Sequence, residues 1–253
     1  MIREKLIASD VGAGKFRWRS REVSRLEGLA DAVFGFAITL LVVSLEVPHT
    51  FDELLFMMRG FLAFAICFAI LLLVWYQQYI FFRRYGMRDT PTIVLNAFLL
   101  FVVLFYIYPL KFVWTFLANI VIKGDPRVRL PGGEMIYPIQ RDQGDTMMIV
   151  YGLGSVAVFA IFAVLYWHAY RRRGEMELNE LEVHDTRVEI TSNLIYVAVG
   201  LVSIALAALH VGGPASAAFS GFAYALLGPV HWLHGRHAGK RRKQLEKAAT
   251  GDK

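Results

Sequence analysis

Two carboxylates, Asp31 and Glu46, flank an uncharged run within the stretch of residues 25 to 48. The 14 uncharged residues between them cover only about 21 Å as an α-helix, because each residue adds about 1.5 Å. A bilayer's hydrocarbon core is about 30 Å thick, so at least one carboxylate would sit at membrane depth. A charge there costs at least about 2.5 to 3.5 kcal/mol. We therefore expect this helix to face protein or water, where such carboxylates can act as coupling groups of a transporter.

Three histidines near the C-terminus, His231, His234 and His237, recur at a spacing of three residues. The first two share a helix face, which can begin a metal or haem site. No carboxylate or cysteine lies near them in sequence and Trp232 lies between them, so interfacial histidines are the favoured interpretation. The sequence also lacks a Gly-rich phosphate loop and a Ser-His-Asp set. We therefore expect no enzyme, no cofactor and no metal ligands.

Hydropathy predicts the elements that position these residues. The chain has 253 residues, of which 56% are hydrophobic, and long runs without Asp, Glu, Lys or Arg recur along it. Such runs are typical of membrane helices. We predict an all-α polytopic membrane protein with six transmembrane helices, at residues 26–48, 54–82, 91–120, 145–170, 188–210 and 214–235. Within them, hydrogen bonding between helices is the expected role of four amide side chains, Gln77, Gln78, Asn96 and Asn193.

Glycines, prolines and charged residues mark the connections. The pattern VRL-PGG-EMIY, within residues 123–144, predicts a small β-hairpin at the membrane surface. The sequence HVGGPAS divides the last charge-free run into two helices. The acidic segment 174–187 indicates a solvated loop or an interfacial helix.

The charge distribution predicts the orientation. The chain divides into a basic leader (1–24), a six-helix transmembrane domain (25–235) and a basic tail (236–253). Six spans place both termini on one side, and most Lys and Arg residues fall on that side. Positively charged loops prefer the cytoplasm, so we expect a multi-pass protein of the cytoplasmic membrane with both termini cytoplasmic. The basic residues follow loops instead of forming one patch, so we expect no nucleic-acid partner.

The first predicted helix has one continuous apolar face. On a wheel of 100° per residue, the large apolar residues of this face fall within about 60° of Phe36. They are Leu29, Val33, Leu40, Val43 and Val47, accompanied by Ala32 and Thr39. Spacings of four and three residues are those of packed parallel helices. Gly28, Ala32, Gly35 and Thr39 form an adjacent strip of small residues that allows close helix approach. Asp31 points roughly 140° away from Phe36, toward a neighbouring helix.

This stretch resembles the first helix of the transmembrane-protein-175 family of potassium channels, in its prokaryotic single-repeat branch. That family shows an Arg-x-x-x-Phe-Ser-Asp motif, an Ala-Ile-Thr-Leu-Leu-Val helix and a closing Val-Pro. Here Arg25 and Asp31 match, while Leu29 and Ala30 stand in place of Phe and Ser. The apolar helix is residues 37–42, followed by Val47 and Pro48. The similarity continues through residues 75–78, without the histidines that the family often has there, and through residues 95–112.

The resemblance implies a homotetramer in which four copies of the first helix line a central pore for monovalent cations. It assigns the hydrophobic selectivity constriction to Phe36, Leu40 and Val43, with Thr39 as a possible hydroxyl ring. All four lie on the apolar face derived above. A narrow apolar ring strips water from an ion without supplying ligands, which favours potassium because it is less strongly hydrated than sodium.

Three alternatives follow from individual residues. Phe36 is bulkier than the Leu or Ile that the family usually has at this position. Four such side chains could close the pore, so one alternative is an occluded channel and another is a channel that conducts protons. A secondary transporter or membrane scaffold using Asp31 is a further alternative. We expect Arg25 and Asp31 to form a structural network in which Asp31 accepts hydrogen bonds from neighbouring helices.

Overall fold

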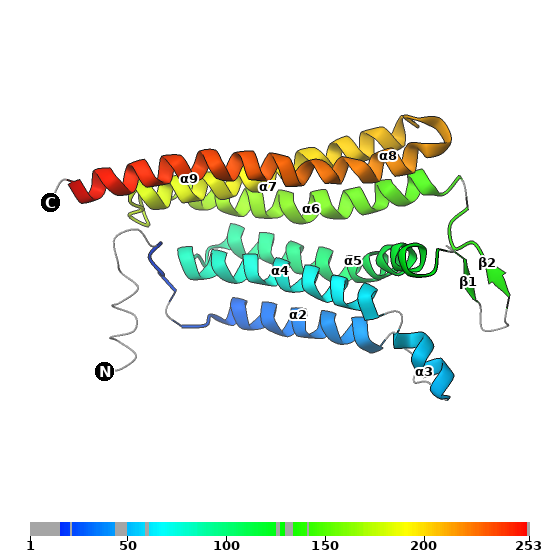
Figure 1. Cartoon of the computed structure of the whole chain (residues 1–253). Coiled ribbons are helices and arrows are strands. Elements are labelled where there is room, and N and C mark those ends of the chain that lie inside the picture. Colours follow the sequence, from blue (N-terminus) through cyan, green and yellow to red (C-terminus); the bar gives the residue numbers. More distant parts are fainter. Residues whose placement is uncertain are drawn as a thin grey trace.

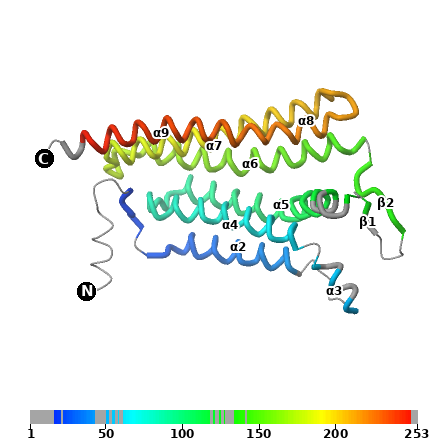
Figure 2. Tube along the Cα trace, viewed as in Figure 1, coloured from blue at the N-terminus to red at the C-terminus, as the bar shows by residue number. Residues whose placement is uncertain are grey.

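The computed structural model describes residues 16–20, 22–43, 50–58, 61–124, 127–129, 134–140 and 142–251. Its helices run side by side in two layers, one with α2, α4 and α5 and the other with α6 to α9 (Figure 1). The helices are α2 (Arg25–Val43), α3 (Phe51–Met58), α4 (Phe61–Tyr85), α5 (Thr90–Lys123), α6 (Gly144–Arg171), α7 (Glu180–Ala208), α8 (Ser216–Ala223) and α9 (Leu227–Gly251). Figure 2 follows the same path from residue 16 to the end of α9.

The apolar helices are long enough to span a bilayer. In the part of the chain that the structure describes, four helices qualify by length and composition: α4, α5 as far as Leu117, α6 and α7. They fall on the second to fifth predicted spans, so the all-helical membrane architecture is confirmed. The 19 residues of α2 coincide with most of the first predicted span. The end of that span, with Glu46, Val47 and Pro48, lies outside the described residues.

The second predicted span, 54–82, is wrong as a single helix. The structure has two helices there, α3 and α4. The 25 residues of α4 already cover about 37 Å, which exceeds the hydrocarbon thickness. Residues 51–58 are therefore not needed to cross the membrane, and Figure 1 shows α3 at an angle to α4.

The last predicted span, 214–235, is longer and less regular than expected. After the short 3₁₀ turn η1 (Gly213–Ala215), α8 passes through a second 3₁₀ turn, η2 (Tyr224–Leu226), into α9. The helix continues through the basic tail to Gly251. Lys, Arg, Gln, Glu and Ala are good helix formers, and α9 packs along α7. The predicted break at HVGGPAS is confirmed, and Gly212 adopts φ 90°, which favours glycine there.

The acidic segment 174–187 is partly helical. Asn179 caps α7, because its side chain accepts from the backbone N–H of Glu182 at 2.9 Å. The Glu182 carboxylate accepts from the Asn179 backbone in return, at 3.1 Å. Glu182 is only 1% exposed, so the prediction of a solvated segment is wrong for this residue.

The predicted hydrogen bonds between amide side chains are confirmed. Gln77 on α4 donates to the Asn193 side chain on α7 at 2.8 Å. Gln78 donates to Asn96, which joins α4 to α5. In an apolar interior these pairs satisfy groups that would otherwise be costly to bury.

The predicted β-hairpin is also confirmed. Strands β1 (Val128–Arg129) and β2 (Met135–Ile136) pair antiparallel, with Val128 opposite Ile136. The hairpin and α3 lie at one end of the helix layers, and residues 16–20 and the end of α9 lie at the other (Figure 1).

Candidate functional site

One face of α2 is buried inside the protomer, where it packs against α4 and α5. The residues of this face, all at most 3% exposed, are Ala30, Phe34, Ala37 and Leu41. Their spacing of three and four residues places them on one side of the helix. They join the main hydrophobic core together with Cys67, Leu71 and Leu99. This contact fixes which side of α2 remains uncovered.

The opposite face of α2 is the one that the sequence predicted for the constriction, and it is open in the protomer. Phe36 is 58% exposed and Leu29 is 55% exposed. Thr39 is also exposed, and Leu40 is half-buried. The side chain of Val43, the last residue of α2, lies outside the described part. The structure thus places Phe36, Thr39 and Leu40 on a surface that no other described helix of the same protomer covers completely.

The Thr39 hydroxyl has a defined donor role. It donates to the backbone carbonyl of Gly35 at 2.9 Å, four residues earlier on the same helix. Because a hydroxyl has one donor and two lone pairs, the oxygen retains acceptor capacity after that bond. Thr39 therefore adds an acceptor oxygen to an otherwise apolar surface.

Asp31 is held by a neighbouring helix, as expected from its position on α2. The indole N–H of Trp75 on α4 donates to its carboxylate at 2.7 Å. Trp75 in turn stacks on Tyr79, with ring centroids 5.7 Å apart. A hydrogen bond to a carboxylate is stronger than one between neutral groups. The bond fixes the rotation of α2 relative to α4.

Arg25 is not joined to Asp31. Its side chain is exposed, and within the described residues it has no hydrogen-bond or ion-pair partner. The structure therefore shows no direct Arg25–Asp31 contact and places only Asp31 in a hydrogen-bonded network.

The N-terminus of α2 is anchored by residues that the sequence analysis did not single out. Ser24 and Glu27 form a reciprocal cap: the Glu27 backbone donates to the Ser24 hydroxyl at 3.1 Å, and the Ser24 backbone donates to the Glu27 carboxylate at 3.0 Å. The motif Ser-x-x-Glu before an apolar run was the available signal.

The segment that precedes α2, residues 16–20, lies across α4 and α7, and we call it the N-terminal strap. Arg17 and Arg19 both donate to the buried Glu182 carboxylate, with closest ion-pair distances of 3.1 and 2.7 Å. Hydrogen bonding to Glu182 raises the pKa of the Arg17 guanidinium above its ordinary value. The Arg19 backbone N–H also donates to the Arg83 carbonyl at 3.0 Å. The strap connects α2 to the ends of α4 and α7.

Two of the C-terminal histidines, His231 and His234, contact α7. Within the described residues, no group of three His, Cys, Asp or Glu side chains lies close enough to hold a metal ion. His231 packs on the Tyr196 ring at 4.5 Å, and His234 lies within 3.4 Å of the Val188 carbonyl. Both contacts join α9 to α7.

These observations define a helical membrane protein that leaves an apolar helix face uncovered at the protomer surface. Comparisons with known proteins identify its kind. Residues 25–106 match the family model described as endosomal/lysosomal potassium channel TMEM175. A protein of Marivirga tractuosa described as a potassium channel is 40% identical over 234 residues, which cover 91% of this chain and 93% of the relative.

Other comparisons point the same way. The crystal structure of the potassium channel MtTMEM175, a variant bound to a nanobody fusion protein, superimposes with a TM-score of 0.77 at 40% identity. That match covers 89% of this chain and 97% of the other. A potassium channel of Chamaesiphon minutus is 34% identical over 96 residues, which cover 35% of this chain and 47% of the relative. The chain belongs to the TMEM175 family, whose members found here are channels and not enzymes.

Proposed function

We propose that the protein is a potassium-permeable channel, a homotetramer in which four copies of α2 line a central pore. Phe36, Thr39, Leu40 and Val43 form the constriction. The observation that carries the proposal is the uncovered apolar face of α2 in a chain that is 40% identical to a potassium channel along nearly its whole length. Permeant potassium is the ion expected in the pore, and the protein needs no cofactor.

The small residues of α2 support contact with further copies of the chain. A Cβ atom added to Gly28 or Gly35 would meet nothing within 4 Å. Gly and other small residues allow membrane helices to approach closely, and among the described residues no helix of the same protomer uses that space. A partner helix from another protomer suits it.

The chemistry of the open face suits permeation by partial dehydration. Phe36 and Leu40 offer no ligand to a cation, so they oppose entry of a fully hydrated ion and favour the ion that loses water more readily. The Thr39 oxygen supplies an acceptor one turn from Phe36. Four such oxygens around an axis would partly replace the lost water.

The proposed orientation places both termini in the cytoplasm and the channel in the cytoplasmic membrane. Basic residues gather at the end of the molecule that carries the strap: Arg83 donates to the Ser20 carbonyl at 3.2 Å, and Arg84 pairs with Glu189 at 2.9 Å. Arg172 lies 3.6 Å from Asp89 at the same level, where α6 ends and α5 begins. Positively charged connections favour the cytoplasmic side.

Potassium flux into liposomes tests the function. We expect the wild-type protein to pass potassium in preference to sodium and Phe36→Ala to increase the flux, because four smaller side chains widen the apolar ring. Phe98→Ala is the matched control, since Phe98 is similarly exposed (53%) but lies on α5. Its flux should equal that of the wild type.

The alternatives give different results in the same assay. If the wild-type protein passes protons but no potassium, its function is that of a proton channel and not of a potassium channel. No flux from the wild type and clear flux from Phe36→Ala would show that Phe36 closes the pore. No flux from either protein would contradict the proposal. So would a mass of the purified protein that corresponds to a monomer, because one copy of α2 cannot surround a pore.

A further inference from the structure

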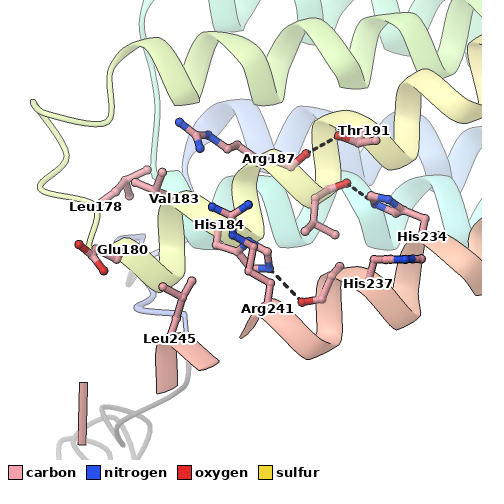
Figure 3. A pocket seen from close by; sticks show the side chains of 12 residues that line it. Leu178, Glu180, Val183, His184, Arg187, Thr191, His234, His237, Arg241 and Leu245 are labelled. Carbon is pink, nitrogen blue, oxygen red and sulfur yellow. Dashed lines mark hydrogen bonds between the residues drawn. The ribbon is translucent and has the colours of Figure 1, made fainter. Parts of the chain in front are cut away.

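A groove lies between the first turns of α7 and the middle of α9, at the end of the molecule that carries the strap. Its volume is about 560 Å³, and Figure 3 shows its lining from both helices. Basic side chains come from both walls, Arg187 from α7 and Arg241 from α9. The ion-conduction proposal does not use this groove.

Neither guanidinium of the groove is neutralised. Within the described residues, Arg187 and Arg241 form no ion pair with a carboxylate, whereas the adjacent Arg242 pairs with Asp185 at 3.2 Å. Arg187 donates instead to the uncharged hydroxyl of Tyr170, from Nε at 3.1 Å. Glu180 is the carboxylate that lines the groove, and it is an exposed residue of the first turn of α7. Two unneutralised guanidinium groups create a site suited to a phosphate.

Two histidines fix the distance between the walls. His184 on α7 bonds through Nε2 to the Ala238 carbonyl at 3.1 Å. His234 on α9 lies with Nε2 3.4 Å from the Val188 carbonyl. Because a carbonyl only accepts, each ring nitrogen donates. Figure 3 shows both contacts bridging the two helices, so the groove is formed before any ligand arrives.

The groove adjoins both ends of the charge-free run 190–235, where we expect the hydrocarbon core of the bilayer to end. Its inner end is lined by Thr191 and His234, which fall at the two ends of the charge-free run 190–235. The side chain of Arg236 covers the Trp232 ring at 4.5 Å just beyond that run, an aromatic and basic pair typical of the membrane interface. A ligand in the groove therefore touches both the hydrocarbon boundary and water.

Apart from His237, the remaining lining is apolar. Val183 and Val188 contribute from α7, and Leu245 contributes from α9. Apolar walls add nothing to the binding of a free phosphate, but they suit the glycerol and first methylenes of a lipid. Basic pockets beside membrane helices bind anionic lipid headgroups in this way.

We propose that the groove binds the phosphate of an anionic phospholipid. Arg187 and Arg241 contact the phosphate from the two walls, and the acyl chains pass along Val188 into the bilayer. Lipid binding in this groove requires only that the groove lies at the edge of the hydrocarbon core. It requires neither a conducting pore nor a particular orientation of the protein in the membrane. It therefore stands or falls independently of potassium conduction.

Binding of phosphatidylglycerol to the purified full chain tests the proposal. The lipid is titrated into protein held in neutral detergent, and the number of bound lipids is read by native mass spectrometry, with phosphatidylcholine and inorganic phosphate as comparison arms. We expect one saturable phosphatidylglycerol per chain. The double variant R187Q/R241Q should bind roughly thirtyfold more weakly, because each basic residue near an anionic lipid contributes about a factor of five.

Two further variants keep the test decisive. R236Q/K240Q removes the same charge from exposed positions of α9 that do not line the groove, and its affinity should change less than about threefold. Glu180→Gln removes the carboxylate of the groove at an exposed position and should tighten binding, even if the double variant fails to fold. Equal losses in the two double variants, equal binding of phosphatidylcholine, or unchanged binding in Glu180→Gln would overturn the site. Occupation by inorganic phosphate as tightly as by lipid would overturn the lipid as its ligand.

Discussion

The two faces of α2 are alike in composition and opposite in their surroundings. Phe34 and Phe36 stand two residues apart on the same helix, yet Phe34 is 3% exposed and Phe36 is 58% exposed. The two positions differ by about 200° around the helix axis, so they point in nearly opposite directions. In a membrane both faces are apolar, and composition alone does not decide which one packs inside the protomer. The difference lies in what covers each face.

Small residues on both faces show the same contrast. Ala30 and Ala37 are fully buried, so on their side the neighbouring helices α4 and α5 already use the space. On the other side, the positions of Gly28 and Gly35 are open. On the buried side, α4 and α5 already approach α2 closely. On the open side, the small residues leave room for another helix to approach α2 in the same way. We infer that the second approach is made by other copies of the chain.

The largest expected effect is a difference in the loss of stability caused by alanine substitutions on the two faces of α2. Phe34→Ala should lower the stability of the protein by about 3 to 5 kcal/mol, because it leaves a cavity in the packed core. Phe36→Ala should change stability by less than about 1 kcal/mol in the isolated protomer, since the side chain there is uncovered. Thermal unfolding in detergent measures both. Equal destabilisation by the two substitutions would remove the distinction between the faces.

The next largest effect is expected when the strap loses the carboxylate of Glu182 that holds it. Glu182→Gln should destabilise the protein by about 3 kcal/mol, because two arginines lose a buried carboxylate partner. Glu180→Gln, two residues earlier and exposed, is the matched control and should have little effect in neutral detergent. Proteolysis near residue 17 measures release of the strap and should accelerate only in Glu182→Gln. If both variants are cleaved at the wild-type rate, the strap does not depend on Glu182.

The smallest effect concerns the hydrogen bond at the margin between the two faces. Trp75→Phe should cost about 1 kcal/mol, the usual contribution of one hydrogen bond, because it removes the donor to Asp31. Asp31→Asn in the Trp75→Phe background should then add little, which a double-mutant cycle on thermal stability detects. Additive losses would show that Asp31 acts through another group.

Much of this arrangement was predictable from local patterns. The periodicity around Phe36 placed it on one side of the helix with Thr39, and both are exposed in the structure, because a helix converts spacing into direction. That this face lines a pore stays a prediction. The span 145–170 closely matches α6, since a charge-free run of that length has one stable solution in a membrane. The capping motif at Ser24 was also readable in the sequence.

The rest depends on contacts between distant parts of the chain. The strap is held by Arg17 and Glu182, which are 165 residues apart and belong to no common pattern. The division of residues 51–85 into α3 and α4 was missed although Arg59 and Gly60 interrupt the apolar sequence there. The helical tail was missed because its basic composition suggests solvent, whereas α9 is supported by α7.

Disulfide crosslinking between α2 helices tests the central claim most directly. In a Cys67→Ala background, which removes the single native cysteine, Thr39→Cys places a thiol on the open face and Leu41→Cys places one on the buried face. Oxidation in membranes should join Thr39→Cys protomers into covalent dimers and leave Leu41→Cys protomers single, because only the open face meets α2 of another copy. Dimers from Leu41→Cys and none from Thr39→Cys would contradict the account.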